Sequence, residues 1–172
     1  MKFHPIEIKF RNASGKWGSL AETAIRTVSP NRIHVEAKLP DGRSFSSSSA
    51  KEALDGGNGV RIKNIKYTHP ERWTTYILWV TQEELDKITF DCEVAAGMCF
   101  RYDYRGAAGC AWSGEHTANK FFCSEVVFDR VISYWLSDAL NNKMHPDKLE
   151  EVVIKLAPML LARKTDYEIN NG

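Results

Sequence analysis

Residues 120–135 read KFFCSEVVFDRVISYW, and they place a cysteine where a short extended segment turns into an amphipathic helix. We expect this helix to run from Cys123 to about Leu136, with Cys123 in its first turn. Backbone N–H groups lack partners in that turn, and the positive end of the helix dipole stabilises a thiolate. The thiolate is the reactive form of cysteine, so this position favours a nucleophile. Position alone also fits a small buried cysteine at the start of a helix.

The composition of the 172-residue chain is that of a globular protein long enough to bury a proper core. Its 23 basic and 22 acidic side chains leave a formal net charge of +1, so no overall field favours nucleic acid or an anionic membrane. No apolar run approaches the ~20 residues that span a bilayer. We therefore expect no nucleic-acid partner and no integral membrane segment.

Four cysteines occur, at positions 92, 99, 110 and 123, and none forms a C-x-x-C pair. The N-terminal sequence MKFHPIEIKF lacks the apolar core and cleavage site of a signal peptide. We therefore expect a cytoplasmic protein with reduced cysteines. Cys110, His116 and Cys123 make a poor set of zinc ligands, so we expect no metal and no other cofactor.

The apolar pattern predicts a mixture of short strands and helices. We predict strands at 3–10, 32–39, 43–49, 60–65 and 73–80, and helices at 19–28, 81–98, 123–136 and 145–157. The strand at 73–80 is apolar enough to be central in a sheet. Ser19 is the expected N-cap of the first helix, and Thr81 and Glu84 have capping-box spacing at the second. The PDG turn at 40–42 is expected to join two strands into a hairpin.

A nucleophilic cysteine needs a base, and five histidines are available. His34 lies in a predicted strand, on its polar face, with Glu36 on the same face. A rigid strand holds an imidazole better than a loop does, so His34 is the first candidate. The alternative for His34 is an exposed residue of the strand. The other histidines lie elsewhere in the sequence, at positions 4, 69, 116 and 145.

The motif FFCSEVV at 121–127 resembles the Y/F-C-S-E-L/V motif of the permuted NlpC/P60 papain-like superfamily, which includes the YiiX-type hydrolases. In that group the histidine strand precedes the cysteine helix, and this chain has the same order. Residues 30–48 resemble the family's S-H-V-x-(I/L)…D-G hairpin, and YDYRGAAG at 102–109 resembles its Tyr-Asp segment. Residues 59–73 look like the connecting segment of phage-encoded members, so the resemblance spans roughly residues 18 to 136.

The resemblance implies an α+β fold of the circularly permuted papain-like type, with a small antiparallel sheet packed against helices. We expect a single domain over residues 1–172, with a core at roughly 18–136 and a C-terminal helical appendage at 143–166. Cys123 is the implied nucleophile and His34 the implied base. In this chemistry the thiol attacks a carbonyl, and the imidazole takes and returns the proton.

The sequence offers candidates on two strands for the residue that orients His34. Glu36 is two residues away on the same face, so the side chains would lie roughly 7 Å apart along the strand. Ser46 or Ser48 on the returning strand could instead lie opposite the imidazole. Asn31 stands where the family usually has Ser or Thr, and HVEA replaces the more common HVGI.

Other residues of the resembling motifs have expected roles of their own. Tyr102 or Tyr104 would offer a hydroxyl near the oxyanion, beside the backbone N–H of Cys123. Glu125 is expected to cap or brace the helix.

The expected function is that of a cysteine peptidase or amidase working through an acyl-enzyme. The resemblance implies a peptide-like or acyl-amide substrate, cell-wall peptides among them, with esters and thioesters as alternatives. It also implies a bacterial or phage-encoded protein, located in the host cytoplasm or the virion in the second case. The competing interpretation is a binding module on the same scaffold, in which the thiol is unused.

Overall fold

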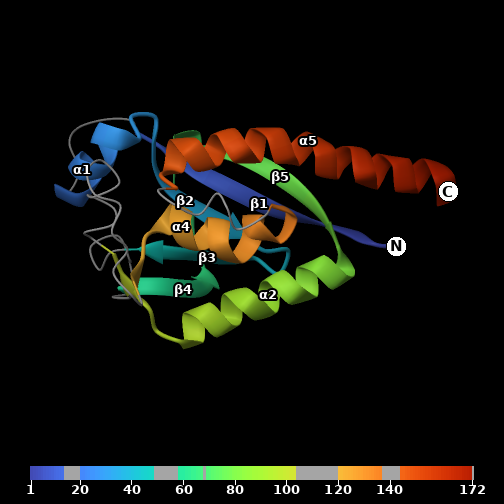
Figure 1. Ribbon diagram of the computed structural model, residues 1–172, viewed down its shortest axis with the longest axis horizontal. Coiled ribbons are helices and arrows are strands. Elements are labelled where there is room, and N and C mark those ends of the chain that lie inside the picture. The colour runs from blue at the N-terminus through green and yellow to red at the C-terminus, as the bar shows by residue number, and fades with distance from the viewer. Residues whose placement is uncertain (14–19, 49–57, 68, 104–119, 137–143, 172) are drawn as a thin grey trace.

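The computed structural model describes residues 1–13, 20–48, 58–67, 69–103, 120–136 and 144–171 (Figure 1). Five strands form an antiparallel sheet in the order β4-β3-β2-β1-β5. Their bounds are β1 (Phe3–Asn12), β2 (Arg32–Lys38), β3 (Arg43–Ser48), β4 (Gly59–Asn64) and β5 (Trp73–Thr81). The sheet and the helices beside it confirm the predicted α+β class.

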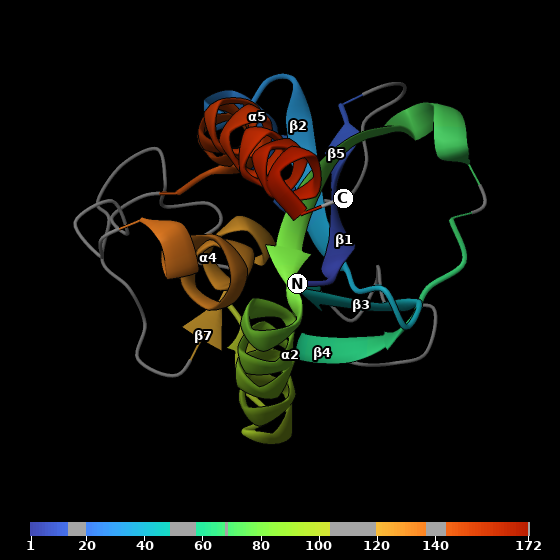
Figure 2. The ribbon, with the colours of Figure 1, turned by 90° about the vertical axis from the view of Figure 1, so that its right-hand side faces the viewer.

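The helices α2, α4 and α5 lie on one face of the sheet (Figure 2). The helical elements are α1 (Leu20–Val28), η1 (Pro70–Arg72), α2 (Gln82–Gly97), α4 (Cys123–Val127), η2 (Phe128–Ile132), η3 (Ser133–Trp135) and α5 (Pro146–Asn171). Two short strands, β6 (Arg101–Tyr102) and β7 (Lys120–Phe121), pair in parallel just before α4. None of the helices in the described ranges combines the length and apolarity needed to cross a bilayer.

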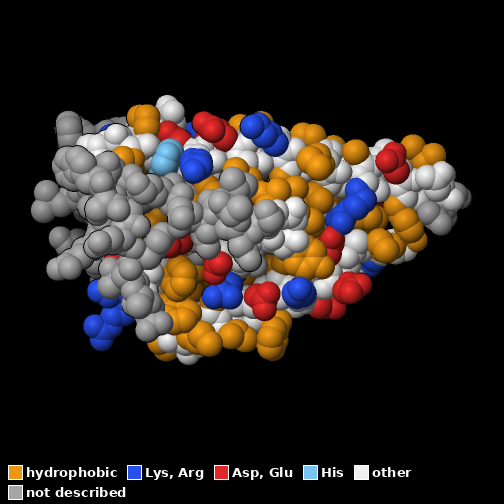
Figure 3. All heavy atoms as spheres, in the orientation of Figure 1, with side chains coloured by type: hydrophobic (Ala, Val, Ile, Leu, Met, Phe, Trp, Pro, Cys, Tyr) orange, Lys and Arg blue, Asp and Glu red, His pale blue; other side chains and the backbone are white. Residues whose placement is uncertain are grey.

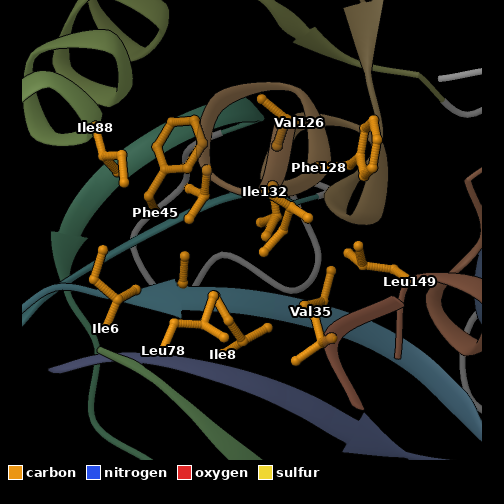
Figure 4. Packing of buried hydrophobic residues seen from close by; sticks show 14 of the residues in the cluster. Ile6, Ile8, Val35, Phe45, Leu78, Ile88, Val126, Phe128, Ile132 and Leu149 are labelled. Carbon is orange, nitrogen blue, oxygen red and sulfur yellow. The ribbon is translucent and has the colours of Figure 1, made fainter. Parts of the chain in front are cut away.

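The hydrophobic core fills the space between the sheet and these helices (Figure 4). On β1 every second side chain is buried, as the period of a strand requires: Ile6, Ile8 and Phe10. They meet side chains such as Val126 of α4 and Leu149 of α5 in one continuous cluster. Burial of this cluster on one face leaves the opposite face of the sheet to polar residues.

The helix α5, which falls in the expected appendage at 143–166, packs into the main hydrophobic cluster. Four of its residues recur at helical spacing and are buried in the main cluster: Leu149, Val153, Leu156 and Leu160. The first strand, β1, also lies outside the range 18–136 and belongs to the same cluster. The helix begins at Pro146, one residue after its predicted start, and continues through Pro158 to Asn171, well beyond the predicted end at 157.

The strand β5 lies at an edge of the sheet, so its predicted central position is wrong. Leu78 and Val80 are buried in the core, whereas Ile77, which points to the other face of the strand, is 44% exposed. The apolar run therefore reflects packing against α5 on one face, and does not reflect burial between two neighbouring strands.

Because β4 and β5 occupy opposite edges, the chain between them must cross the sheet. It does so on the face away from the helices (Figure 2). We call residues 65–67 and 69–72 the crossover segment. Tyr67 of this segment shares a hydrogen bond of 2.7 Å with the hydroxyl of Ser44 on β3, and the ammonium of Lys9 on β1 lies 5.0 Å from its ring centre. The crossover segment thus covers the polar face of the sheet.

Two local predictions are confirmed. The β2–β3 hairpin turns through Gly42, whose φ of 92° requires glycine, and the Gly42 N–H donates to the carbonyl of Leu39 at 3.0 Å. At the start of α2, the Glu84 N–H donates to the Thr81 hydroxyl at 3.3 Å, and the Thr81 N–H donates to the Glu84 carboxylate at 2.7 Å. The expected N-cap Ser19 lies outside the described residues.

The helices α2 and α5 also carry apolar side chains on their outer surfaces (Figure 3). On α2 these include Phe90 and Val94, and on α5 they include Met159 and Ile169. The two helices are therefore apolar on more than the side that faces the sheet.

Candidate active site

Cys123 is the first residue of α4 and is almost completely buried, with 1% of its surface exposed. The preceding residue, Phe122, is extended and serves as the N-cap. All five residues of α4 are buried, and the Ser124 hydroxyl donates to the carbonyl of Met144, so the helix start is held firmly. The predicted single helix is present as three consecutive helical segments, with a π-helical turn in the middle and an end at Trp135.

The start of α4 lies beside β2 and β3 at a point where those strands separate. Their ladder contains two residue pairs, Ala37 with Phe45 and Lys38 with Ser44. Farther along β3, the hydroxyl of Ser47 donates to the carbonyl of Phe121, just before Cys123, at 2.7 Å. The interrupted ladder therefore lets the thiol approach the side chains of β2.

His34 and Glu36 project from the same face of β2 and contact each other directly. Nε2 of His34 lies 3.0 Å from Oε1 of Glu36, and both side chains are buried. Because Glu36 occupies Nε2, Nδ1 is the nitrogen left for the thiol. The Cys123 side chain lies beside that of His34, close enough for its charge and for hydrogen bonding to raise the pKa of the imidazole. The structure thus brings together the three residues that the sequence singled out.

The pKa of His34 reflects this arrangement. Burial lowers it, but the charge of a Cys123 thiolate and the hydrogen bonds to Cys123 and Glu36 raise the pKa of His34 to about 10. The imidazole is therefore protonated at neutral pH and faces the sulfur as a cation. An imidazolium beside the sulfur is the arrangement that favours a cysteine nucleophile.

Arg61 of β4 completes the polar cluster, and sequence reasoning missed it. Its Nη2 donates to Oε1 of Glu36 at 2.6 Å, and its Nε donates to the hydroxyl of Ser48 at 2.8 Å. Burial raises the pKa of Glu36, but hydrogen bonds and charge from His34 and Arg61 outweigh burial and lower it. Glu36 is therefore an ionised carboxylate between two cations. An arginine in an otherwise ordinary strand pattern gave no signal of this role.

Trp73 and Tyr67 form an aromatic wall beside the imidazole. The ring centres of His34 and Trp73 are 6.2 Å apart, and those of Tyr67 and Trp73 are 5.1 Å apart, both in edge-to-face geometry. Burial, followed by the charge of Glu36, raises the pKa of the Tyr67 hydroxyl. The wall comes from the crossover segment and the first residue of β5, and it explains why side chains on the polar face of the sheet are buried.

The remaining candidates lie in other surroundings. The Ser46 hydroxyl donates to the carbonyl of Val35 at 2.7 Å, so its hydrogen is directed at the backbone. Ser48 reaches Glu36 indirectly, through Arg61. Tyr102 is buried in a second apolar cluster with Ile25, Ile33 and Phe122. Tyr104 lies outside the described residues.

Glu125 has the capping role expected of it. Burial raises the pKa of this carboxyl to about 8, although a hydrogen bond from the backbone N–H of Phe122 acts in the opposite direction. The charges of Asp103 and Asp129 raise it further. Glu125 therefore binds the N-cap residue of α4 and is largely protonated at neutral pH.

Within the described ranges, no group of three or more His, Cys, Asp or Glu side chains could hold a metal ion. Comparison of the chain with protein-family models, curated proteins and solved structures gives no match.

Proposed function

We propose that this protein is a cysteine hydrolase of the circularly permuted papain-like type, which cleaves an amide, ester or thioester through an acyl-enzyme at Cys123. The observation that carries the proposal is the buried contact of Cys123, His34 and Glu36, in which the imidazole lies beside both the thiol and the carboxylate. The order of the chain, with the histidine strand first and the cysteine helix later, supports the permuted type.

In the proposed reaction the Cys123 thiolate attacks the carbonyl carbon and forms a tetrahedral intermediate. The backbone N–H of Cys123, at the start of α4, is available to donate to the oxyanion. The imidazolium of His34 gives its Nδ1 proton to the leaving group as the bond to that group breaks. The neutral imidazole then takes a proton from water, which attacks the acyl-enzyme and regenerates the thiolate–imidazolium pair. Glu36 accepts a hydrogen bond from the Nε2–H of His34 throughout the reaction.

The proposed substrates are peptide-like or acyl-amide compounds, cell-wall peptides among them, and the proposed location is the cytoplasm. The resemblance of the motif at 121–127 supports the substrate class. A bacterial or phage-encoded setting is proposed on the same basis.

The first experiment measures the reactivity of the thiol. The protein is treated with iodoacetamide at about pH 6, below the ordinary pKa of a thiol, and labelled cysteines are mapped by mass spectrometry. Cys123 should label faster than the exposed Cys99 or the buried Cys92, whose pKa is raised by burial. His34→Ala should slow labelling of Cys123 and leave the rate at Cys99 unchanged.

The second experiment distinguishes a hydrolase from a binding module. Incubation with p-nitrophenyl acetate should add one acetyl group at Cys123, detected by intact mass and peptide mapping, and release nitrophenol repeatedly. Cys123→Ser and His34→Ala should lose this turnover. Labelling of Cys99 as fast as Cys123, with no acetyl group at Cys123, would assign the scaffold to the binding class.

A further inference from the structure

We infer that Arg61 is a positioning residue for the Cys123–His34 pair and acts through Glu36. The inference rests on the proposed function, since it assigns a role in the same site. It goes beyond the three residues of that proposal because it makes the pair depend on a fourth side chain from a different strand.

Arg61 holds Glu36 by geometry. One carboxylate oxygen, Oε1 of Glu36, lies 2.6 Å from Nη2 of Arg61 and 3.0 Å from Nε2 of His34. The other oxygen lies 3.4 Å from Nη1 of Arg61. A guanidinium that meets both oxygens fixes the plane of the carboxylate, and so fixes the oxygen that receives the imidazole N–H.

Arg61 is itself held in place. Its Nε donates to the hydroxyl of Ser48 at 2.8 Å, and the two strands β3 and β4 that carry these residues are paired in register. The side chain of Arg61 is only 10% exposed, so solvent does not compete strongly for its donors. The orientation of Glu36 is therefore set by the sheet and not by the flexible end of an exposed side chain.

Arg61 also balances charge. In the proposed reactive form, the thiolate of Cys123, the imidazolium, the carboxylate and the guanidinium follow one another, so each charge has an opposite neighbour. Removal of the guanidinium would leave two buried anions around one cation, which is unfavourable in an interior of low dielectric constant. Glu36 would then take up a proton at a higher pH, and a neutral carboxyl group no longer stabilises the imidazolium.

The charged and titratable groups that face Glu36 come from several elements. His34 lies on the same strand, Arg61 on β4 and Tyr67 in the crossover segment. On the neighbouring strand β1, Lys9 is the register partner of Glu36, but its ammonium pairs with Glu7 at 2.7 Å. Arg61 is therefore the cation bound to Glu36 from outside β2.

The test is the pH dependence of Cys123 alkylation by iodoacetamide, measured in the whole chain for the parent protein and five variants. In Arg61→Met, the pH at which the rate of Cys123 alkylation is half of its maximum should rise by about one unit. We call this pH the midpoint. The rate of labelling near pH 6 should fall about tenfold. Arg61→Lys keeps the positive charge but lacks the planar guanidinium that meets both carboxylate oxygens. Its midpoint should therefore lie between those of Arg61→Met and the parent protein.

Arg32→Met is the matched control. Arg32 is also a strand arginine in a two-point pair, with both donors 2.7 Å from Glu150, and it is two residues from His34. Its loss should weaken the protein without moving the midpoint. An equal shift in Arg32→Met and Arg61→Met would show a general effect of lost stability and would overturn the inference.

A double-variant cycle tests the route through Glu36. In a Glu36→Gln background, Arg61→Met should produce no further shift, because the group through which Arg61 acts is already gone. The double variant also removes both partners of the buried ion pair and leaves no unpaired charge. It can therefore be compared with Glu36→Gln even if Arg61→Met alone does not fold. A full additional shift in the double variant would overturn the inference. If Cys123 is not selectively reactive in the parent protein, the proposed function itself fails. If Cys123 is selectively labelled but Arg61→Met leaves the midpoint unchanged, only the positioning role of Arg61 is rejected.

Discussion

Nε2 of His34 and Oε1 of Glu36 are 3.0 Å apart, and these side chains are 7% and 3% exposed. A hydrogen bond at this depth does more than one at the surface, because little water competes for either group. It fixes the tautomer and the ring orientation of His34 and directs Nδ1 toward Cys123. The proposed chemistry depends on this contact.

Replacement of Glu36 by Gln should lower turnover of p-nitrophenyl acetate by on the order of ten- to a thousandfold, less than the loss in Cys123→Ala. The amide keeps the shape of the side chain but removes the charge that stabilises the imidazolium. Glu7→Gln is the control, since Glu7 pairs with Lys9 and Lys38 on the same face and is partly exposed. Its turnover should be unchanged. Full activity in Glu36→Gln would contradict the orienting role.

The two serines of β3 should behave differently. Ser46→Ala removes a bond to the carbonyl of Val35, so we expect a cost of about 1 kcal/mol in the free energy of unfolding and unchanged turnover. Ser48→Ala removes an acceptor of Arg61, so we expect a several-fold loss of turnover. Urea unfolding and steady-state rates measure the two effects. Loss of turnover in Ser46→Ala together with full activity in Glu36→Gln would move the orienting group to β3.

The stability of the fold should decline on both sides of a window of pH. The pKa of His34 is raised from 6.5 to about 10, so its contribution is complete below about pH 6.5 and is lost as the pH rises toward 10. The pKa of Glu36 is lowered from 4.5, so its contribution is complete above that value and is lost as the pH falls below it. Urea midpoints should reveal both declines, and His34→Gln should reduce the alkaline decline. An equally steep alkaline decline in His34→Gln would contradict the assignment.

Glu125→Gln should stabilise the protein at about pH 8 relative to pH 4. The pKa of Glu125 is raised from 4.5 to about 8, so between these values the folded state retains a proton that the unfolded state releases. The parent protein therefore loses stability as the pH rises through this range. Glutamine still accepts the N–H of Phe122 but does not titrate. The difference in unfolding free energy between variant and parent should grow by at least about 1 kcal/mol from pH 4 to pH 8. A difference that is the same at both pH values would contradict a buried, protonated Glu125.

The features that the sequence predicted correctly depend on residues near one another in the chain. The capping box needs Thr81 and Glu84, and the shared face of His34 and Glu36 needs one strand with a period of two. The cysteine at a helix start follows from a change of apolar period within a few residues. Such patterns are visible in a single sequence because the backbone geometry that causes them is local.

The features that the sequence did not reveal depend on the order of strands in the sheet. An apolar run fits a central strand or an edge strand beneath a helix, and the structure shows the second for β5. Arg61 meets Glu36 although β4 and β2 are not adjacent, because Arg61 extends past β3. Trp73 reaches His34 because the chain crosses the polar face before β5 begins. None of these relationships has a signature in the spacing of nearby residues.

The crossover segment also constrains the order in which the chain can fold. The polar face of β2 is closed only after β5 has paired with β1, and Cys123 follows both strands in the chain. Pairing between such distant segments is slow, because a long loop must close before contacts form. A growing polypeptide would therefore carry His34 as a hydrated imidazole and Cys123 as an ordinary thiol. The proposed activated pair would arise only after β5 and α4 have been synthesised and have packed on the sheet, so a nascent chain that lacks them would not expose a strong nucleophile.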